Sequence, residues 1–350
     1  MLLSAVTLSG PVAAYAKKKT ATSPKKEAVK QTPYEKLFKD KKGQCLKGMF
    51  TVHKVDGKVY FEVPERLLGR DMLLGSTVSE INDNSDALVG AKPVKPLHVR
   101  FVQQDSMIVL QEFTARSTVI DPGYENIAPA VKINKAPATF ATFPVKAYAP
   151  DSSRVIDVTS LFLTDIKSLR PFDAHSSMGG MASRTVNFKK DLAYLDDIKA
   201  FDDNVSVKSV LTYSSDMKVL GVLTLYKDKP TTAKMTRTFL LLPEEPMRPR
   251  IADSRIGTFF AGVEHFSDED QVKALYYANR WNLEPSDEAA YKRGELVAPK
   301  KPIVFYVDSA FPEAWKPAIK QGIEDWNMAF EKIGFKNAVQ AVDFPTDDPE

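Results

Sequence analysis

Histidine is the side chain used most often for zinc binding and proton transfer, and this chain of 350 residues contains four of them. A helical zinc motif of the form His-Glu-x-x-His needs two histidines four residues apart, because both must lie on one helix face, with the glutamate between them as general base. The histidines are His53, His98, His175 and His265. None is followed by glutamate, and no two are four residues apart. We therefore interpret each as a strand or loop residue with an ordinary hydrogen bond, and we expect no catalytic, metal-ligating or cofactor-binding residue in this chain.

Three further segments contain residue types that are used in catalysis or binding. Cys45 is the only cysteine, which excludes an intrachain disulfide, and we interpret it as a small buried hydrophobic side chain. Residues 175–181, HSSMGGM, match neither a nucleophile elbow nor a phosphate-binding loop, and are interpreted as a connector. A proline-rich segment carries four charged side chains that suit either a carboxylate clamp or, as we favour, an ion-pair network: Arg248, Arg250, Asp253 and Arg255.

The elements that would position such residues are clearest near the C-terminus. Residues 303–307, IVFYV, are apolar and rich in β-branched and aromatic side chains, which predicts a buried strand. A helix is predicted next, because apolar residues recur at steps of three and four, and Gly334, which is free to adopt positive φ, ends it. A second strand is predicted over residues 335–342, so that the strand, helix and strand have apolar faces without a partner sheet. The apolar stripe of the helix consists of Trp315, Ile319, Ile323, Trp326, Phe330 and Ile333.

This C-terminal segment resembles the first strand and first helix of secreted bacterial zinc-dependent metalloproteases of metzincin type. In that family two mostly β domains of undefined role precede the protease. The resemblance implies a zinc metalloendopeptidase that acts on proteins or peptides, with zinc held by a His-Glu-x-x-His site beyond Glu350. No ligand can be transferred to a residue of this chain, so we expect these 350 residues to bind no zinc. The matching strings are 302–306 (PIVFY), 322–331 (GIEDWNMAFE) and 334–338 (GFKNA), and upstream 155–159, 241–250, 253–257 and 280–284.

Period-two alternation of apolar and polar residues dominates the middle of the chain and indicates β-strands. Asp56-Gly57 between two such runs is a strong hairpin signal. Residues 270–281 suit either a helix or a strand, and we favour the strand. Residues 144–150, with a proline at each end, are interpreted as a connection, and residues 160–169 as a short helix. Further strands are predicted over 205–213, 218–226 and 234–242.

The predicted fold class is α+β and predominantly β, with two β-rich domains followed by the first strand-helix-strand of an α/β metalloprotease domain. Length and a hydrophobic content of 43% allow two to three domains. The predicted divisions are a signal peptide (1–16), a disordered Lys-rich tether (17–33), a small N-terminal β-rich domain (34–90), a larger β-rich domain (91–298) and the incomplete start of a metzincin-like catalytic domain (299–350).

The N-terminal residues predict export to the periplasm or the extracellular space. Residues 2–14 are apolar but too short to span a bilayer, and Ala14-Tyr15-Ala16 has the small-x-small pattern of a signal-peptidase site. No later run is long enough for a membrane helix. Six lysines and one glutamate in residues 17–30 carry +5, whereas the whole chain carries +3, so the rest carries −2 and offers no general basic surface for nucleic acid. The oligomeric state is left open.

The sequence is therefore consistent with two functions. In the first, the chain is the N-terminal portion of a secreted zinc metallopeptidase, and its β-rich domains support or restrain a protease domain that lies beyond residue 350. In the second, it is a non-catalytic exported β-rich binding module. An ending at Asp347-Asp348-Pro349-Glu350, directly after a predicted strand, favours the first.

Overall fold

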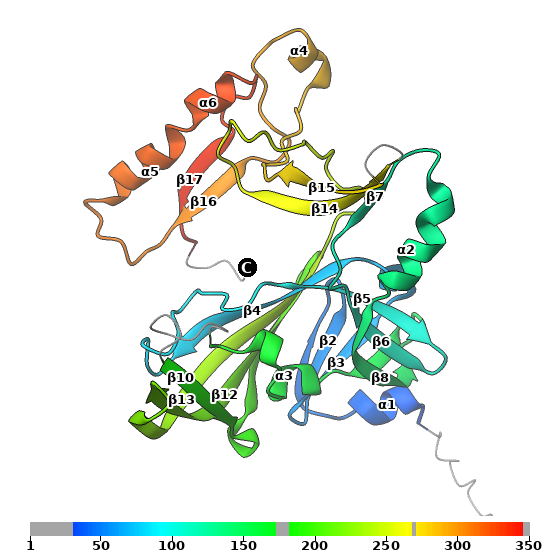
Figure 1. The fold of residues 1–350 in the computed structure, drawn as a ribbon. Helices are drawn as coiled ribbons and strands as arrows, with labels where there is room; N and C mark the ends of the chain where they lie inside the picture. The colour runs from blue at the N-terminus through cyan, green and yellow to red at the C-terminus, as the bar shows by residue number, and fades with distance from the viewer. Residues whose placement is uncertain (1–30, 173–181, 268–270, 346–350) are drawn as a thin grey trace, which may run out of the picture. The chain divides into compact units, whose positions relative to one another are not determined.

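The computed structural model describes residues 31–172, 182–267 and 271–345. The chain is predominantly β, as the alternation predicts, and it divides into two compact units (Figure 1). The first unit comprises residues 31–112 and 139–242, and the second comprises 113–138 and 243–345. The predicted signal peptide, residues 17–30 of the tether, the connector 175–181 and the last five residues lie outside the described part. Among the described residues, no helix is long and apolar enough to cross a lipid bilayer.

The first unit is built on a sheet of twelve strands, which is nearly closed. Its strand order is β1-β2-β3-β9-β8-β6-β5-β4-β13-β12-β10, and β11 also pairs with β12. The two ends of the sheet approach each other, as two hydrogen bonds show. The Met49 N–H, just before β2, donates to the backbone oxygen of Phe201, just after β11, at 2.6 Å. Lys54 Nζ of β2 donates to the backbone oxygen of Asp196 in β11. The strands are β1 (Gly43–Leu46), β2 (Thr51–Val55), β3 (Lys58–Val63), β4 (Met72–Ile81), β5 (Leu97–Gln104), β6 (Met107–Glu112), β8 (Ala138–Tyr148), β9 (Arg154–Asp157), β10 (Ala182–Phe188), β11 (Tyr194–Ala200), β12 (Asn204–Val219) and β13 (Leu223–Leu241).

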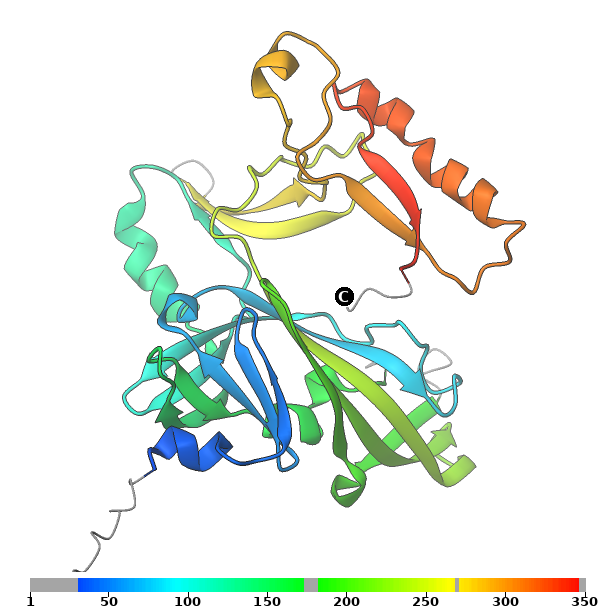
Figure 2. The ribbon, with the colours of Figure 1, turned by 180° about the vertical axis from the view of Figure 1, so that it is seen from behind.

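A long hairpin of β12 and β13 forms one wall of this sheet (Figure 2). The sequence predicts three strands here, whereas the structure has two, with the turn at Leu220-Gly221, where both residues have positive φ. The prediction of a strand over 218–226 is therefore wrong. The polar residues near Asp228 are typical of a turn. In the structure they instead form an irregularity in the pairing of β12 with β13, where the Asp228 N–H donates to the Asp216 carboxylate.

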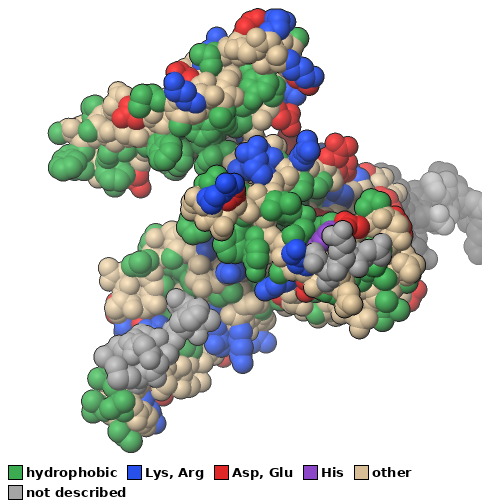
Figure 3. All heavy atoms as spheres, turned by 45° about the horizontal axis from the view of Figure 1, so that its top comes forward, with side chains coloured by type: hydrophobic (Ala, Val, Ile, Leu, Met, Phe, Trp, Pro, Cys, Tyr) green, Lys and Arg blue, Asp and Glu red, His purple; other side chains and the backbone are tan. Residues whose placement is uncertain are grey.

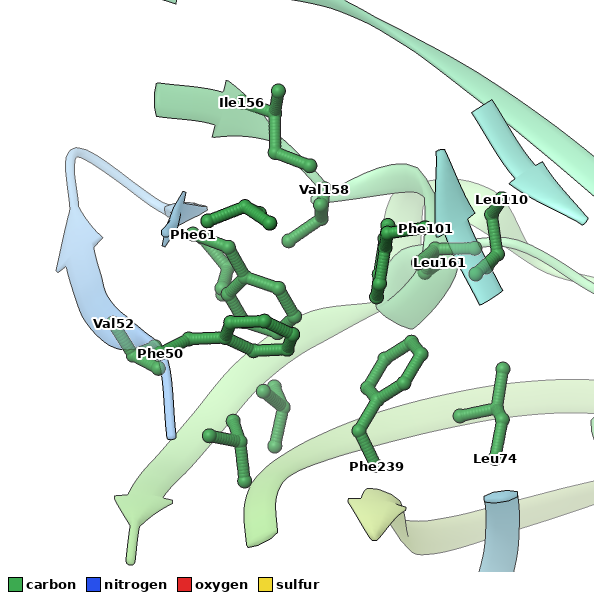
Figure 4. Packing of buried hydrophobic residues seen from close by; sticks show 14 of the residues in the cluster. Phe50, Val52, Phe61, Leu74, Phe101, Leu110, Ile156, Val158, Leu161 and Phe239 are labelled. Atoms are coloured by element: carbon green, nitrogen blue, oxygen red, sulfur yellow. The ribbon is translucent and has the colours of Figure 1, made fainter. Parts of the chain in front are cut away.

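The interior of the sheet is a hydrophobic core with four phenylalanine rings at its centre, Phe50, Phe61, Phe101 and Phe239 (Figure 4). They come from residues far apart in sequence and point to one region because alternate residues of a strand face the same side of a sheet. Their ring centroids lie 5.1 to 6.5 Å apart in the pairs that contact, the range of stacked and edge-to-face aromatic pairs.

Helix α3 (Ser160–Leu163) contributes Leu161 and Phe162 to the same core. Its position is held by Arg237 of β13, whose guanidinium donates to the Leu161 and Leu169 oxygens. Arg237 is fully buried, and this burial lowers the pKa of its guanidinium to about 10. The predicted helix over 160–169 is thus shorter, and after three non-helical residues a separate 3-10 turn follows, η3 (Lys167–Leu169).

Local predictions in the first unit have mixed outcomes. The hairpin at Asp56-Gly57 is confirmed, with φ of 51° and 71°. Residues 144–148, by contrast, belong to strand β8 rather than to a connection. Pro144 removes no N–H from the ladder to β9, because that ladder begins at Val145. The interpretation of Cys45 as buried is wrong, since it is exposed on the terminal strand β1.

Helix α1 (Pro33–Phe38) packs on the outside of β2 and β3. A capping box of Thr32 and Glu35 and a proline in the first turn begin the helix. Tyr34 Oη donates to Glu62 Oε1 at 2.7 Å, and Phe38 stacks on His53 with ring centroids 3.9 Å apart. Burial, and then the hydrogen bond to Glu62, raise the pKa of Tyr34 above its usual value.

The second unit contains two small sheets and most of the helical turns. One sheet has the order β15-β14-β7, and the other is the parallel pair β16 and β17. The predicted strand over 270–281 is confirmed as β15. A strand, helices and a second strand also follow residue 302, but the strand over 303–307 is not buried, since its three middle residues are exposed. The predicted single helix is divided into α5 and α6, and the second strand begins at Val339 rather than at residue 335. Gly334 has a φ of 91°. The elements are β7 (Thr118–Ile120), α2 (Ala128–Asn134), β14 (Phe260–Ser267), β15 (Gln271–Ala278), α4 (Glu288–Lys292), β16 (Ile303–Val307), α5 (Lys316–Glu324), α6 (Asn327–Glu331) and β17 (Val339–Asp343), and the remaining 3-10 turns of the chain are η1 (Glu65–Leu67), η2 (Glu125–Ile127) and η4 (Lys190–Leu192).

The compact units group the chain differently from the predicted segments 34–90, 91–298 and 299–350. The twelve-stranded sheet continues across residue 90, since β4 pairs with both β5 and β13. Residues 113–138 and 243–298 join the C-terminal segment in the second unit.

Candidate binding groove of the second unit

Two cavities in the second unit share the side chains of Trp281 and Phe330. Their volumes are about 660 and 450 Å³. We call the surface that lines them the aromatic groove. The larger cavity is lined by Arg250, Asn279, Arg280, Trp281, Leu283, Pro285, Tyr291, Phe330, Ile333 and Phe335. The smaller cavity is lined by Trp281, Ile303, Phe305, Gly322, Ile323, Trp326, Phe330 and Val339.

The polar side of the larger cavity is formed where the proline-rich segment meets the end of β15. The Ala278 N–H donates to the Arg250 oxygen at 2.9 Å, which places Arg250 beside Asn279 and Arg280. Arg280 Nη2 donates to the Arg248 oxygen at 2.6 Å and is thereby held in one orientation. Two arginines and one asparagine thus line one cavity.

The apolar wall of the larger cavity comes from α4, α6 and the turn after α6. The rings of Tyr291 and Phe335 are 5.1 Å apart, and Tyr291 Oη donates to the Ile333 oxygen at 2.9 Å. Gly334 allows this approach, because a Cβ at that position would lie 2.6 Å from the Tyr291 ring. The helix stop that the sequence predicts at Gly334 therefore also shapes the cavity wall.

The smaller cavity lies between the β16–β17 pair and helices α5 and α6, and it is lined almost entirely by apolar side chains. Phe305 of β16 contacts Trp281 edge to face, with ring centroids 6.4 Å apart. Trp281 is 58% exposed and Trp326 is 65% exposed. Hydrophobic side chains gather at the surface along helices α5 and α6 (Figure 3). Large aromatic side chains left in water beside a concavity are typical of a binding surface, because each has apolar area still to bury.

No aspartate or glutamate lines either cavity of the aromatic groove. Among the described residues, Arg250 and Arg280 have no carboxylate partner, whereas Asp253 pairs with Arg255 at 2.5 Å. Hydrogen bonds from the Arg255 side chain and backbone lower the pKa of Asp253. The predicted ion-pair network is therefore right for Asp253 and Arg255. It is wrong for Arg248 and Arg250, which have no ion pair among the described residues, and Arg250 lines the larger cavity instead.

The histidines lie elsewhere, and each described one shares a hydrogen bond with one carboxylate. His53 pairs with Glu62 at 2.6 Å, His98 with Asp71 at 2.5 Å and His265 with Asp121 at 2.7 Å. Burial of Asp71 opposes its ionisation, but hydrogen bonds from Arg100 and His98 outweigh that effect and lower its pKa. His175 lies outside the described residues.

The family resemblance implies a zinc site beyond Glu350, and the described residues offer no second set of zinc ligands. Across residues 31–172, 182–267 and 271–345, no three His, Cys, Asp or Glu side chains are grouped closely enough to hold a metal ion.

The chain is thus predominantly β, and its second unit has exposed aromatic side chains beside two cavities. The chain belongs to the family described as a domain of unknown function, DUF5117, which matches residues 92–286. A second domain of unknown function, DUF5118, matches residues 31–81. Searches of curated proteins and of solved structures found no match.

Most of the groove cannot be predicted from the sequence. Trp326 and Phe330 lie on a predicted apolar stripe, which indicates that this helix face packs against something but does not identify its partner. Trp281 carried the clearest signal, because it stands alone among polar residues in the segment Asn279-Arg280-Trp281-Asn282. Phe305 lies in a run typical of a buried strand, so nothing in the sequence indicates that it lines a groove.

Proposed function

We propose that this chain is the non-catalytic N-terminal portion of a secreted zinc-dependent metallopeptidase, and that it binds polypeptide in the aromatic groove. The large sheet of the first unit serves as a stable scaffold in this proposal. Support comes from the strings that resemble those of metzincin-type proteases and from the β16–α5–α6–β17 arrangement, which has the order of elements that this resemblance implies.

The observation that carries the binding role is the exposure of Trp281 and Trp326 beside Phe305 and Phe330 in one groove. Burying a large apolar side chain contributes about 1.5–3 kcal/mol, so a few such contacts are enough for a specific peptide complex. Rigid aromatic rings lose little conformational entropy on binding, which favours them as contacts for varied apolar side chains. An extended segment of an unfolded protein offers such side chains to both cavities.

A second candidate is a binding module that acts without a protease domain. It is favoured by the fact that the residues lining both cavities all belong to the second unit, so that the groove needs no further chain to form. Reading the coding sequence past codon 350 separates the two candidates. A downstream His-Glu-x-x-His supports the first, and its absence from the remaining reading frame overturns it.

Peptide binding is tested with purified protein and an array of 15-residue peptides that covers the sequence of β-casein. We expect apolar peptides to bind, and we expect Trp281→Ala to weaken binding by about 10-fold or more, the equivalent of about 1.4 kcal/mol. The matched control is Trp315→Ala, because Trp315 is 66% exposed but lines neither cavity. A protein that binds no peptide, or equal losses in the two variants, would refute a peptide-binding groove.

A further inference from the structure

We propose that the larger cavity of the aromatic groove recognises a peptide C-terminus whose last residue is apolar. In this proposal, which rests on the peptide-binding role proposed above, Arg250 and Arg280 bind the terminal carboxylate. The side chain of the same last residue packs on Trp281 and Phe330.

The charge of the cavity favours an anion. It is lined by Arg250, Arg280 and Asn279, and by no aspartate or glutamate. Acidic groups nearby in sequence already have partners, since Glu284 pairs with Lys300 at 3.1 Å and Asp253 pairs with Arg255. A ligand carboxylate would therefore meet two arginines that have no competing carboxylate among the described residues.

Arg280 has donors left for a carboxylate. Arg280 uses one N–H for the Arg248 oxygen, and a guanidinium has five N–H groups, so it retains donors for a ligand. Charge-assisted hydrogen bonds from arginine to carboxylate are among the stronger polar contacts in proteins, and they form in parallel pairs. Because Arg280 is already held, less side-chain entropy is lost when a ligand binds.

The apolar wall begins directly beside the cationic groups. Trp281 follows Arg280 in the chain, and Phe330 faces the same cavity. In a C-terminal residue the carboxylate and the side chain share one Cα, so both fit a site in which cation and aromatic wall adjoin. An internal acidic residue would have its apolar neighbour on the next Cα, about 3.8 Å along the chain. The cavity of about 660 Å³ is within the range of ordinary ligand pockets.

The ligand class is thus a peptide fragment with a free C-terminus after an apolar residue. Such ends are the products of a peptidase that cleaves after apolar side chains. The groove would then hold cleaved fragments by their new C-termini.

The test uses the 350-residue chain and three fluorescein-labelled peptides, with binding measured by fluorescence anisotropy. The first peptide, Gly-Ser-Gly-Ala-Leu-Phe, has a free C-terminus, the second is its amide, and the third is the amide with glutamate in place of alanine. We expect amidation to weaken binding by at least 10-fold and the internal glutamate not to restore it. Arg250→Gln and Arg280→Gln should each weaken binding of the free acid by a similar factor, whereas the control Arg255→Gln should leave it unchanged.

The outcomes separate this inference from the proposed function. If the acid and the amide bind equally, and Trp281→Ala still abolishes binding, the peptide groove stands and C-terminal recognition is overturned. Restoration by the internal glutamate also overturns it, because any carboxylate would then suffice. If none of the three peptides binds, C-terminal recognition is overturned, and the array decides the proposed function separately. Circular dichroism of each variant confirms that it is folded.

Discussion

Truncating Phe239 tests whether the ring cluster at the centre of the large sheet holds the first unit together. Phe239 is 0% exposed, and its ring centroid lies 5.3 Å from that of Phe101, 5.9 Å from Phe61 and 6.5 Å from Phe50. The substitution Phe239→Ala therefore removes a ring that is enclosed by other rings (Figure 4). Because hydrogen-bonded strands surround the site, the walls have little freedom to collapse into the space.

The expected loss follows from that enclosure. Phe→Ala changes in protein cores cost about 3–5 kcal/mol, and the upper part of this range applies where a cavity persists. We expect about 4 kcal/mol, a large fraction of the roughly 5–15 kcal/mol that stabilises a typical domain. With a urea dependence of about 3 kcal/mol/M, the midpoint of unfolding should fall by about 1.3 M.

Far-UV circular dichroism is the appropriate assay, because the three tryptophans, at positions 281, 315 and 326, all lie in the second unit and would not report on the first. Leu240→Ala is the matched control. Leu240 is the next residue of β13, points to the other face and is 39% exposed, so its loss should cost less than about 1 kcal/mol. A loss below 1 kcal/mol for Phe239→Ala, or equal losses for the two variants, would refute the packing argument.

Further expectations concern the closure of the sheet, pH and local opening. Gly48→Ala should destabilise the first unit by about 1–3 kcal/mol, because the new Cβ would lie 2.5 Å from the backbone oxygen of Phe201. The control Gly75→Ala should not destabilise it, since the space around Gly75 is open. Equal urea midpoints of unfolding for the two variants would contradict this expectation. The raised pKa of Tyr34 means that its contribution to stability is complete below about pH 10, the value in an unfolded chain, and is lost as pH rises above it. Tyr34→Phe should remove this alkaline loss, and an unchanged pH profile of unfolding would refute its origin. Limited trypsin digestion should cut residues 292–301 or the helix after them before the first unit, and earlier cleavage inside the large sheet would reverse that order of stability.

Local conformation was predicted well from the sequence where it depends on neighbouring residues alone. The turn at Asp56-Gly57 and the helix end at Gly334 both follow from residues that tolerate positive φ. The strand at residues 303–307 follows from its composition. The long hairpin of β12 and β13 was not predicted, because a Leu-Gly turn lacks the polar residues by which turns are usually recognised, and because β13 pairs with β12 on both sides of the irregular stretch near Asp228.

The amino-acid sequence by itself determined the predominance of β-structure and the order of elements after residue 302, since both are written in periodicity and turn residues. Only the tertiary structure decided that Arg250, Arg280, Trp281, Phe305 and Phe330 line one groove. Periodicity marks an apolar or charged face, but it cannot show whether another element covers that face. Which faces stay open depends on contacts between residues distant in the chain, and these form only when the second unit folds.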